Sequence, residues 1–155
     1  MEKIASFKIN HDKLKKGMYI SRIDDDIVTY DIRMKLPNNK ENDYMKNGAM
    51  HTFEHLFATY TRNTKYSKNI VYVGPMGCRT GFYFLVRNKI SHKEALQLIK
   101  ECFEFIKEFK GEIPDSKKEE CGNYLEHDLN GAKEIAKDMI DVLKNWTVEK
   151  MTYEQ

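Results

Sequence analysis

The sequence predicts an α+β fold in which an antiparallel sheet is packed on one face by helices. Two observations favour this class. Apolar and polar residues alternate with period two early and in the middle of the chain, and three segments carry the 3.6-residue apolar period of amphipathic helices. A chain of 155 residues is long enough for one substantial core. We therefore expect a single domain over residues 1–155.

Four segments are expected to form the strands. Apolar residues occupy every second position from Val28 to Leu36, and residues 20–23 are a candidate hairpin partner because three aspartates at 24–26 favour a turn. Residues 70–73 and 81–86 predict two short strands around the Gly-Pro-Met-Gly sequence at 74–77. The polar segment 37–48, which is rich in Asn and also holds Pro and Gly, predicts a loop.

Three helices are expected. The first covers about residues 49–63, where one apolar stripe follows the helical period. The sequence Ser-His-Lys-Glu at 91–94 matches a capping box and opens the second helix, which Gly111 is placed to end. The third runs from about residue 128 to residue 146, again with one apolar face.

Composition and charge exclude several classes of protein. The 26 Lys and Arg residues nearly balance the 24 Asp and Glu residues, which argues against a dedicated nucleic-acid-binding protein. The longest apolar stretch, 82–86, is far shorter than a membrane-spanning helix, and the charges among the first twenty residues leave no apolar core for a signal peptide. The odd number of cysteines does not suggest a disulfide framework. We expect a reduced, cytoplasmic protein without nucleic-acid or membrane partners.

The most informative segment is His51-Thr52-Phe53-Glu54-His55. Two histidines four residues apart lie on one face of a helix and can chelate a metal ion, and Glu54 projects near the same face, where it can handle protons. This H-x-x-E-H order is the inverse of the commoner zinc-protease motif. The alternative interpretation is a pair of surface histidines on an amphipathic helix.

The predicted chelating face points away from the apolar stripe of its own helix. A catalytic metal ion on an open surface needs a cover, and a second subunit of a homodimer is an economical candidate. Two histidines also need a third protein ligand, for which Cys121 and Cys78 are both candidates. Cys102 lies on an apolar stripe and is expected in the core, His92 is expected at the surface, and the pattern leaves His11 and His127 undecided. A His-His-Cys set suits zinc or ferrous iron.

Three segments of the chain resemble the signature segments of the S-ribosylhomocysteine lyase (LuxS) family. They are His51-Thr-Phe-Glu-His55, Pro75-Met-Gly-Cys-Arg-Thr-Gly-Phe-Tyr83 and Cys121-Gly-Asn-Tyr-Leu-Glu-His127. The resemblance extends to Ser6-Phe7 with His11, and to Tyr30-Asp-Ile-Arg33 followed by Pro37-Asn38. It spans residues from about 4 to 140 in the order and spacing of the family.

The resemblance implies an α+β homodimer of the LuxS, inverted-zincin-like type with two active sites at the subunit interface. It implies one Fe²⁺ per subunit, which Zn²⁺ or Co²⁺ can replace, held by His51, His55 and Cys121 with water in the open position. The residues that match the general acid/base pair are Glu54 and Cys78. The residues that match the substrate-holding positions, partly across the interface, are Ser6, His11 and Arg33.

The implied reaction explains these residue types. The ribose of S-ribosyl-L-homocysteine opens to an aldehyde, and the metal ion acts on its oxygens as a Lewis acid. Proton transfers by Cys78 and Glu54 would move the carbonyl from C1 to C3, after which the C5–sulfur bond breaks by β-elimination. The products are L-homocysteine and 4,5-dihydroxy-2,3-pentanedione, the precursor of the quorum-sensing signal autoinducer-2.

The chain also departs from the family pattern. Before Pro75 the family usually has Asp-Ile-Ser, where this chain has Tyr72-Val73-Gly74, and after Arg33 it commonly has Phe-Cys, where this chain has Met34-Lys35. Two rival interpretations follow: a non-catalytic metal-binding relative, and a small metallohydrolase of the inverted-motif class. The latter would complete its site with a downstream glutamate on a much longer chain.

Overall fold

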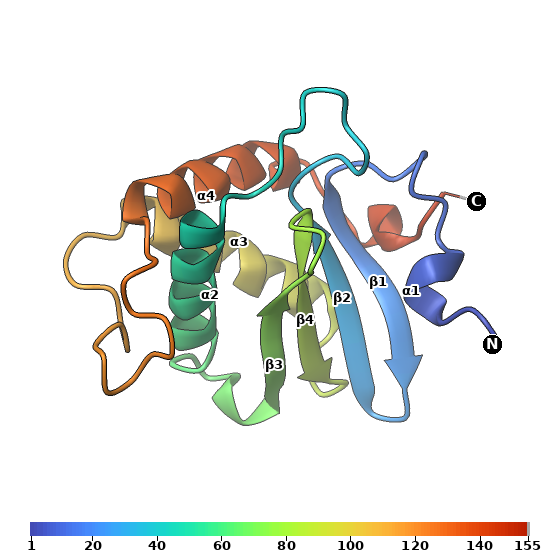
Figure 1. Ribbon diagram of the computed structural model, residues 1–155. Helices are drawn as coiled ribbons and strands as arrows, with labels where there is room; N and C mark the ends of the chain where they lie inside the picture. The colour runs from blue at the N-terminus through green and yellow to red at the C-terminus, as the bar shows by residue number, and fades with distance from the viewer. Residues whose placement is uncertain (155) are drawn as a thin grey trace.

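The computed structural model describes residues 1–154 and shows a four-stranded sheet with helices packed against it (Figure 1). The strands are β1 (Gly17–Asp24), β2 (Ile27–Arg33), β3 (Ile70–Pro75) and β4 (Gly81–Arg87). The helices are α1 (Ala5–Lys8), α2 (Asn47–Thr61), α3 (His92–Glu108) and α4 (Leu129–Leu143), with short 3-10 turns at Ser67–Asn69 and Val148–Met151. The strand order is β1-β2-β4-β3, and every neighbouring pair is antiparallel, which confirms the predicted α+β class.

Alternation along the two central strands decides which face of the sheet is buried. Tyr30 pairs with Phe84 and Ile32 pairs with Phe82, and all four side chains are fully buried on the face that meets the helices. Strand β2 ends at Arg33, three residues before the predicted end. The backbone N–H groups of residues 34 and 35 both donate to the carbonyl of Thr80, so the regular ladder stops there, and Leu36 is 46% exposed.

The three long helices follow the expected periods. The capping box of α3 is present: the Ser91 hydroxyl accepts from the Glu94 N–H, and the Glu94 carboxylate accepts from the Ser91 N–H. Helix α4 ends at Leu143, before the predicted end at 146, because the Trp146 indole turns back and donates to the carbonyl of Met18 in β1 over 2.8 Å. Cys102 is fully buried on α3, as expected.

Helix α2 is positioned by its apolar stripe. Phe53, Leu56 and Phe57 are fully buried against the sheet and α3, which leaves His51 and His55 on the opposite, partly exposed side. The segment between α3 and α4 runs along that side (Figure 1). Among residues 1–154, no helix is both long and apolar enough to span a membrane.

Candidate metal centre

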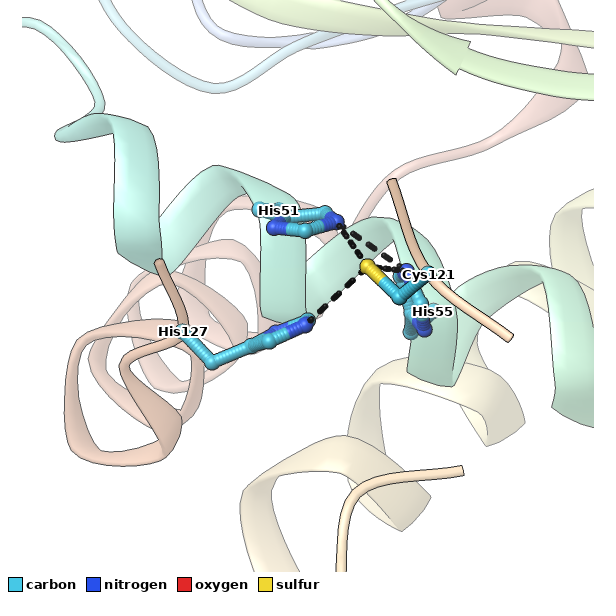
Figure 2. A group of neighbouring side chains, drawn as sticks. All are labelled: His51, His55, Cys121 and His127. Atoms are coloured by element: carbon cyan, nitrogen blue, oxygen red, sulfur yellow. Dashed lines mark hydrogen bonds between the residues drawn. The ribbon is translucent and has the colours of Figure 1, made fainter. Parts of the chain in front are cut away.

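Four side chains from two parts of the chain meet beside α2. His51 and His55 come from the second and third turns of this helix, and Cys121 and His127 come from the segment that precedes α4 (Figure 2). The Cys121 sulfur lies 3.4 Å from His51 Nε2, 3.9 Å from His55 Nε2 and 3.8 Å from His127 Nε2. All four ligand atoms lie within 4.8 Å of one another, so this group could hold a metal ion.

The loop that covers this group belongs to the same chain. His51 Nδ1 donates to the carbonyl of Glu126 over 2.7 Å, and His55 Nδ1 donates to the carbonyl of Pro114 over 2.8 Å. Both carbonyls lie in the segment between α3 and α4, so this segment of the same chain lies over the chelating face of α2. The argument for a second subunit therefore has to rest on other surfaces.

These two hydrogen bonds fix the tautomers of the two helix histidines. A carbonyl only accepts, so each Nδ1 carries the proton and each Nε2 presents a lone pair. In the neutral rings, the two Nε2 lone pairs face each other at 3.1 Å. A cation at the centre removes this repulsion. Tetrahedral bond lengths of zinc or a similar ion give N–N separations of roughly 3.3 Å and N–S separations of roughly 3.6 Å, close to those found.

His127 is the member of the group that the sequence left undecided. Its Nδ1 lies 3.0 Å from the hydroxyl of Thr52, which also accepts from the N–H of Asp128, and its ring stacks on that of His51 with centroids 4.0 Å apart. Burial, and then the charges of His51 and His55, lower its pKa below the ordinary value, which favours the neutral, ligating form. In the sequence, the feature that could have indicated this role is the position of His127, six residues after Cys121 and directly before the helix N-cap residue Asp128.

A second cluster gathers two other predicted site residues. Cys78 lies in the β3–β4 turn, and its sulfur is 3.0 Å from the hydroxyl of Thr80. Arg33, at the end of β2, donates from Nη1 to that same hydroxyl over 2.6 Å and is only 3% exposed. Two further N–H groups of Arg33 bind the carboxylate of Asp31. Thr80 and Asp31 therefore join Cys78 and Arg33 in one polar cluster that the sequence did not predict.

The other predicted site residues, Glu54, Ser6 and His11, form no hydrogen bond with either cluster within residues 1–154. Glu54 lies between the two ligating positions on α2, and its carboxylate has no hydrogen-bond partner within residues 1–154. Ser6, on α1, lines a surface pocket of about 320 Å³ together with Tyr83 of β4. His11 bonds to the carbonyl of Ile9 over 2.9 Å. In the described part of the chain, no contact joins His11 to the other predicted site residues.

The two departures before Pro75 are coupled in space. A side chain at Gly74 would place its Cβ 2.1 Å from the Tyr72 hydroxyl, so the phenol of Tyr72 lies where a residue with a side chain at 74 would extend. Tyr72 is 53% exposed and borders the same pocket as Ser6 and Tyr83. The substitution of Asp-Ile-Ser by Tyr-Val-Gly is thus one change of shape at this pocket rather than two independent changes.

An antiparallel sheet backed by helices, together with a His-His-Cys-His group at one helix, defines an α+β protein with a candidate metal-binding site. A family model described as S-Ribosylhomocysteinase (LuxS) matches residues 4–150. An S-ribosylhomocysteine lyase of Phocaeicola vulgatus is 44% identical over 99% of this chain and 98% of its own length. Those of Clostridium beijerinckii and Porphyromonas gingivalis are 45% identical over 99% of both chains. The chain belongs to the S-ribosylhomocysteine lyase (LuxS) family.

Proposed function

We propose that this protein cleaves S-ribosyl-L-homocysteine to L-homocysteine and 4,5-dihydroxy-2,3-pentanedione. Family membership over residues 4–150 and relatives that carry this enzyme name support the proposal. One structural observation carries its chemistry: two imidazole nitrogens and a cysteine sulfur converge on one point. Such a donor set suits a divalent transition-metal ion. The diketone product would make the protein a source of the autoinducer-2 precursor in quorum sensing.

The ligands we infer are His51, His55 and Cys121, with one Fe²⁺ per subunit that Zn²⁺ or Co²⁺ can replace. His127 would then occupy the fourth side of the centre, where its Nε2 lies within reach of the same point. When bound, the ion would polarise the carbonyl and hydroxyl oxygens of the opened ribose as a Lewis acid.

The proton transfers are assigned to Cys78 and Glu54. The Cys78 sulfur and the Glu54 carboxylate would remove a proton from the carbon beside the carbonyl and return one to the carbonyl carbon, while the hydroxyl proton of the first carbon passes to the carbonyl oxygen. Repeated once, this exchange moves the carbonyl from C1 through C2 to C3. Removal of the C4 proton then expels the homocysteine sulfur from C5. Both side chains are accessible in this structure: Cys78 is exposed, and Glu54 is partly exposed and unpaired within residues 1–154.

Substrate contacts are assigned to Ser6, His11 and Arg33. Three N–H groups of Arg33 are already bound to Asp31 and Thr80, so at most its two remaining N–H groups face a ligand. Ser6 borders the pocket of about 320 Å³ on the sheet face away from the core helices.

The assembly we propose is a cytoplasmic homodimer of single-domain subunits, residues 1–155, of the inverted-zincin-like type, with both active sites at the interface. The sheet face that the core helices leave open borders a pocket lined by exposed apolar side chains, among them Ile4 at 59% and Tyr72 at 53%. Within residues 1–154 of one chain, no hydrogen bond or ion pair joins the candidate metal centre to the Cys78 cluster. A partner subunit would bring the second cluster to the first. We expect no nucleic-acid or membrane partner.

The proposed function is tested with a Cys78→Ala variant. The metal-loaded variant should release homocysteine at least about a hundredfold more slowly than the wild type, because a proton carrier is lost, yet bind the same amount of metal. Thiol release and metal content are measured on the same samples. Loss of metal along with turnover would place Cys78 at the metal centre instead. A wild type that is fully loaded and inactive would favour a non-catalytic metal-binding protein.

A further inference from the structure

A continuous chain of hydrogen bonds leads from the C-terminal segment to the Cys78 sulfur. The Tyr153 hydroxyl lies 2.7 Å from Asp31 Oδ2, and Asp31 accepts from Nε and Nη2 of Arg33. Arg33 Nη1 lies 2.6 Å from the Thr80 hydroxyl, which lies 3.0 Å from the Cys78 sulfur. Asp31, Arg33 and Thr80 are each no more than 3% exposed, and Tyr153 lies beyond residues 4–150, the part that the family model matches.

The groups at the two ends of this chain fix the direction of its bonds as far as the Thr80 oxygen. Arg33 has only donors, so the Thr80 oxygen must accept from it. Within residues 1–154, the other partner of the Thr80 hydroxyl is the Cys78 sulfur, and the Thr80 proton is therefore free to point at that sulfur. A sulfur that accepts such a proton is stabilised as the thiolate.

The Thr80 backbone is held in place from several sides. Its carbonyl accepts from the N–H groups of Met34 and Lys35 over 2.8 and 2.9 Å. The next residue, Gly81, packs so closely on β2 that a Cβ there would lie 2.3 Å from the carbonyl of Ile32. Thr80 is thus anchored to the end of β2 that also carries Arg33, and the Thr80 hydroxyl has little freedom to leave the guanidinium.

We propose that Thr80 is a positioning residue, which transmits the Arg33 charge to Cys78 and holds that sulfur as a hydrogen-bonded thiolate. The inference rests on the proposed role of Cys78 as a proton carrier. Asp31 and Tyr153 act one step further away, since they fix the guanidinium in the orientation that reaches Thr80.

Among the charged groups in this chain of hydrogen bonds, Arg33 lies nearer to Cys78 than Asp31 does, and it favours the thiolate. Burial lowers the pKa of Arg33, but the charge of Asp31 and its hydrogen bonds outweigh burial and raise that pKa above the ordinary value. Asp31 opposes the thiolate, but Arg33 and Tyr153 bind its carboxylate. Tyr83 and Tyr153 stay neutral, because burial, and then Asp31, raise the pKa of each phenol.

The test measures alkylation of Cys78 by iodoacetamide across a pH series on the metal-loaded protein, with the modified peptide quantified by mass spectrometry. Thr80→Val keeps the shape but removes the hydroxyl, so alkylation near neutral pH should slow about tenfold, with the profile displaced to higher pH. Thr80→Ser keeps the hydroxyl and should follow the wild type. An unchanged profile in Thr80→Val overturns the proposal, as does an equal displacement in Thr80→Ser.

Tyr153→Phe decides the matter if Thr80→Val does not fold. This variant keeps the ring that stacks on Tyr19 and loses only the hydroxyl on Asp31, so a smaller displacement in the same direction is expected. An unchanged profile in Tyr153→Phe would then count against the chain of contacts. Alkylation of Cys78 does not require turnover, so the two proposals can fail separately. If the alkylation profiles shift as expected but the protein does not cleave S-ribosylhomocysteine, only the proposed function is refuted. If the protein is fully active but the profiles do not shift, only this inference is refuted.

Discussion

At the scale of single residues, the metal centre depends on what holds each imidazole from behind. His51 and His55 are oriented by backbone carbonyls, and His127 is oriented by Thr52, so all three Nε2 atoms converge on Cys121. His92 is a useful contrast. Its Nδ1 bonds to the hydroxyl of Tyr30 over 2.7 Å, outside this group, which makes it a packing contact of the α3 N-terminus.

Removal of the His127 imidazole should weaken metal binding while leaving the other three donors in place. His127→Ala is expected to lower the affinity for Co²⁺ by about 10- to 100-fold, the range seen when a supporting or weak ligand is lost. Competition with a coloured chelator measures this affinity, and His92→Ala is the matched control. Equal affinities in the two variants would exclude His127 from the centre.

The buried pair of Arg33 and Asp31 makes a separate prediction about stability. Asp31→Ala leaves a guanidinium that is 3% exposed without its counter-charge and should lower the free energy of unfolding by about 3–5 kcal/mol. The control is Asp24→Ala, which breaks the exposed pair with Arg22 and should change stability far less. Urea denaturation compares the two. Similar losses of unfolding free energy in the two variants would mean that the buried pair stabilises the fold no more than the exposed pair does.

What the sequence predicted about these residues depended on spacing. Two histidines at i and i+4 meet on any helix, so His51 and His55 could be paired in advance. Cys121 could not be separated from Cys78 by spacing alone, because each is brought to its place by a turn whose contacts are distant along the chain. Thr80, Tyr153 and His127 lacked a local pattern of this kind, and only the fold brings them to their clusters.

At the scale of elements, packing decides where helices and strands end. The stripe of α2 and the cap of α3 were readable because both are local patterns. The ends of β2 and α4 were predicted three residues too late. After β2, the N–H groups of Met34 and Lys35 donate to the carbonyl of Thr80, and after α4 the Trp146 indole donates to the carbonyl of Met18. Both contacts join residues that are distant along the chain. Helix α1, which has no buried residues, gave no apolar period to detect.

Strand β3 carries the coupled pair of Tyr72 and Gly74. Gly74→Ala should displace the Tyr72 ring and lower the free energy of unfolding by at most about 1 kcal/mol, because the added methyl group overlaps the phenol, which is the movable end of a half-exposed side chain. In a Tyr72→Ala background the same change should cost much less. A double-mutant cycle by thermal or urea unfolding measures the coupling. Additive effects would show that the two positions are independent.

At the scale of the whole molecule, the two functional clusters lie on different parts of one subunit. The candidate metal centre lies between α2 and the segment that precedes α4. Cys78 lies in the β3–β4 turn, next to the end of β2 that carries Arg33. The sheet face away from the core helices, with Ile4 and Tyr72 exposed beside its pocket, is the surface on which we place a second subunit.

The protein should therefore sediment with about twice the mass of one 18.3 kDa chain. Tyr72→Glu places a charge on the proposed interface and should shift the population toward single chains, whereas Lys144→Glu, on the exposed surface just after α4, should not. Analytical ultracentrifugation measures the mass of both variants. A monomeric wild type would refute the shared active site, and a dimer unaffected by Tyr72→Glu would place the interface elsewhere.

The central claim is that this chain is a metal-dependent carbon–sulfur lyase, and product stoichiometry tests it most directly. The protein is purified without oxygen, loaded with Fe²⁺ or Co²⁺ and given S-ribosylhomocysteine, and both products are quantified. A metal-dependent lyase should produce equal amounts of homocysteine and 4,5-dihydroxy-2,3-pentanedione, and it should produce neither after the metal is removed by a chelator. Undiminished release from the metal-free protein, or homocysteine without the diketone, would contradict it.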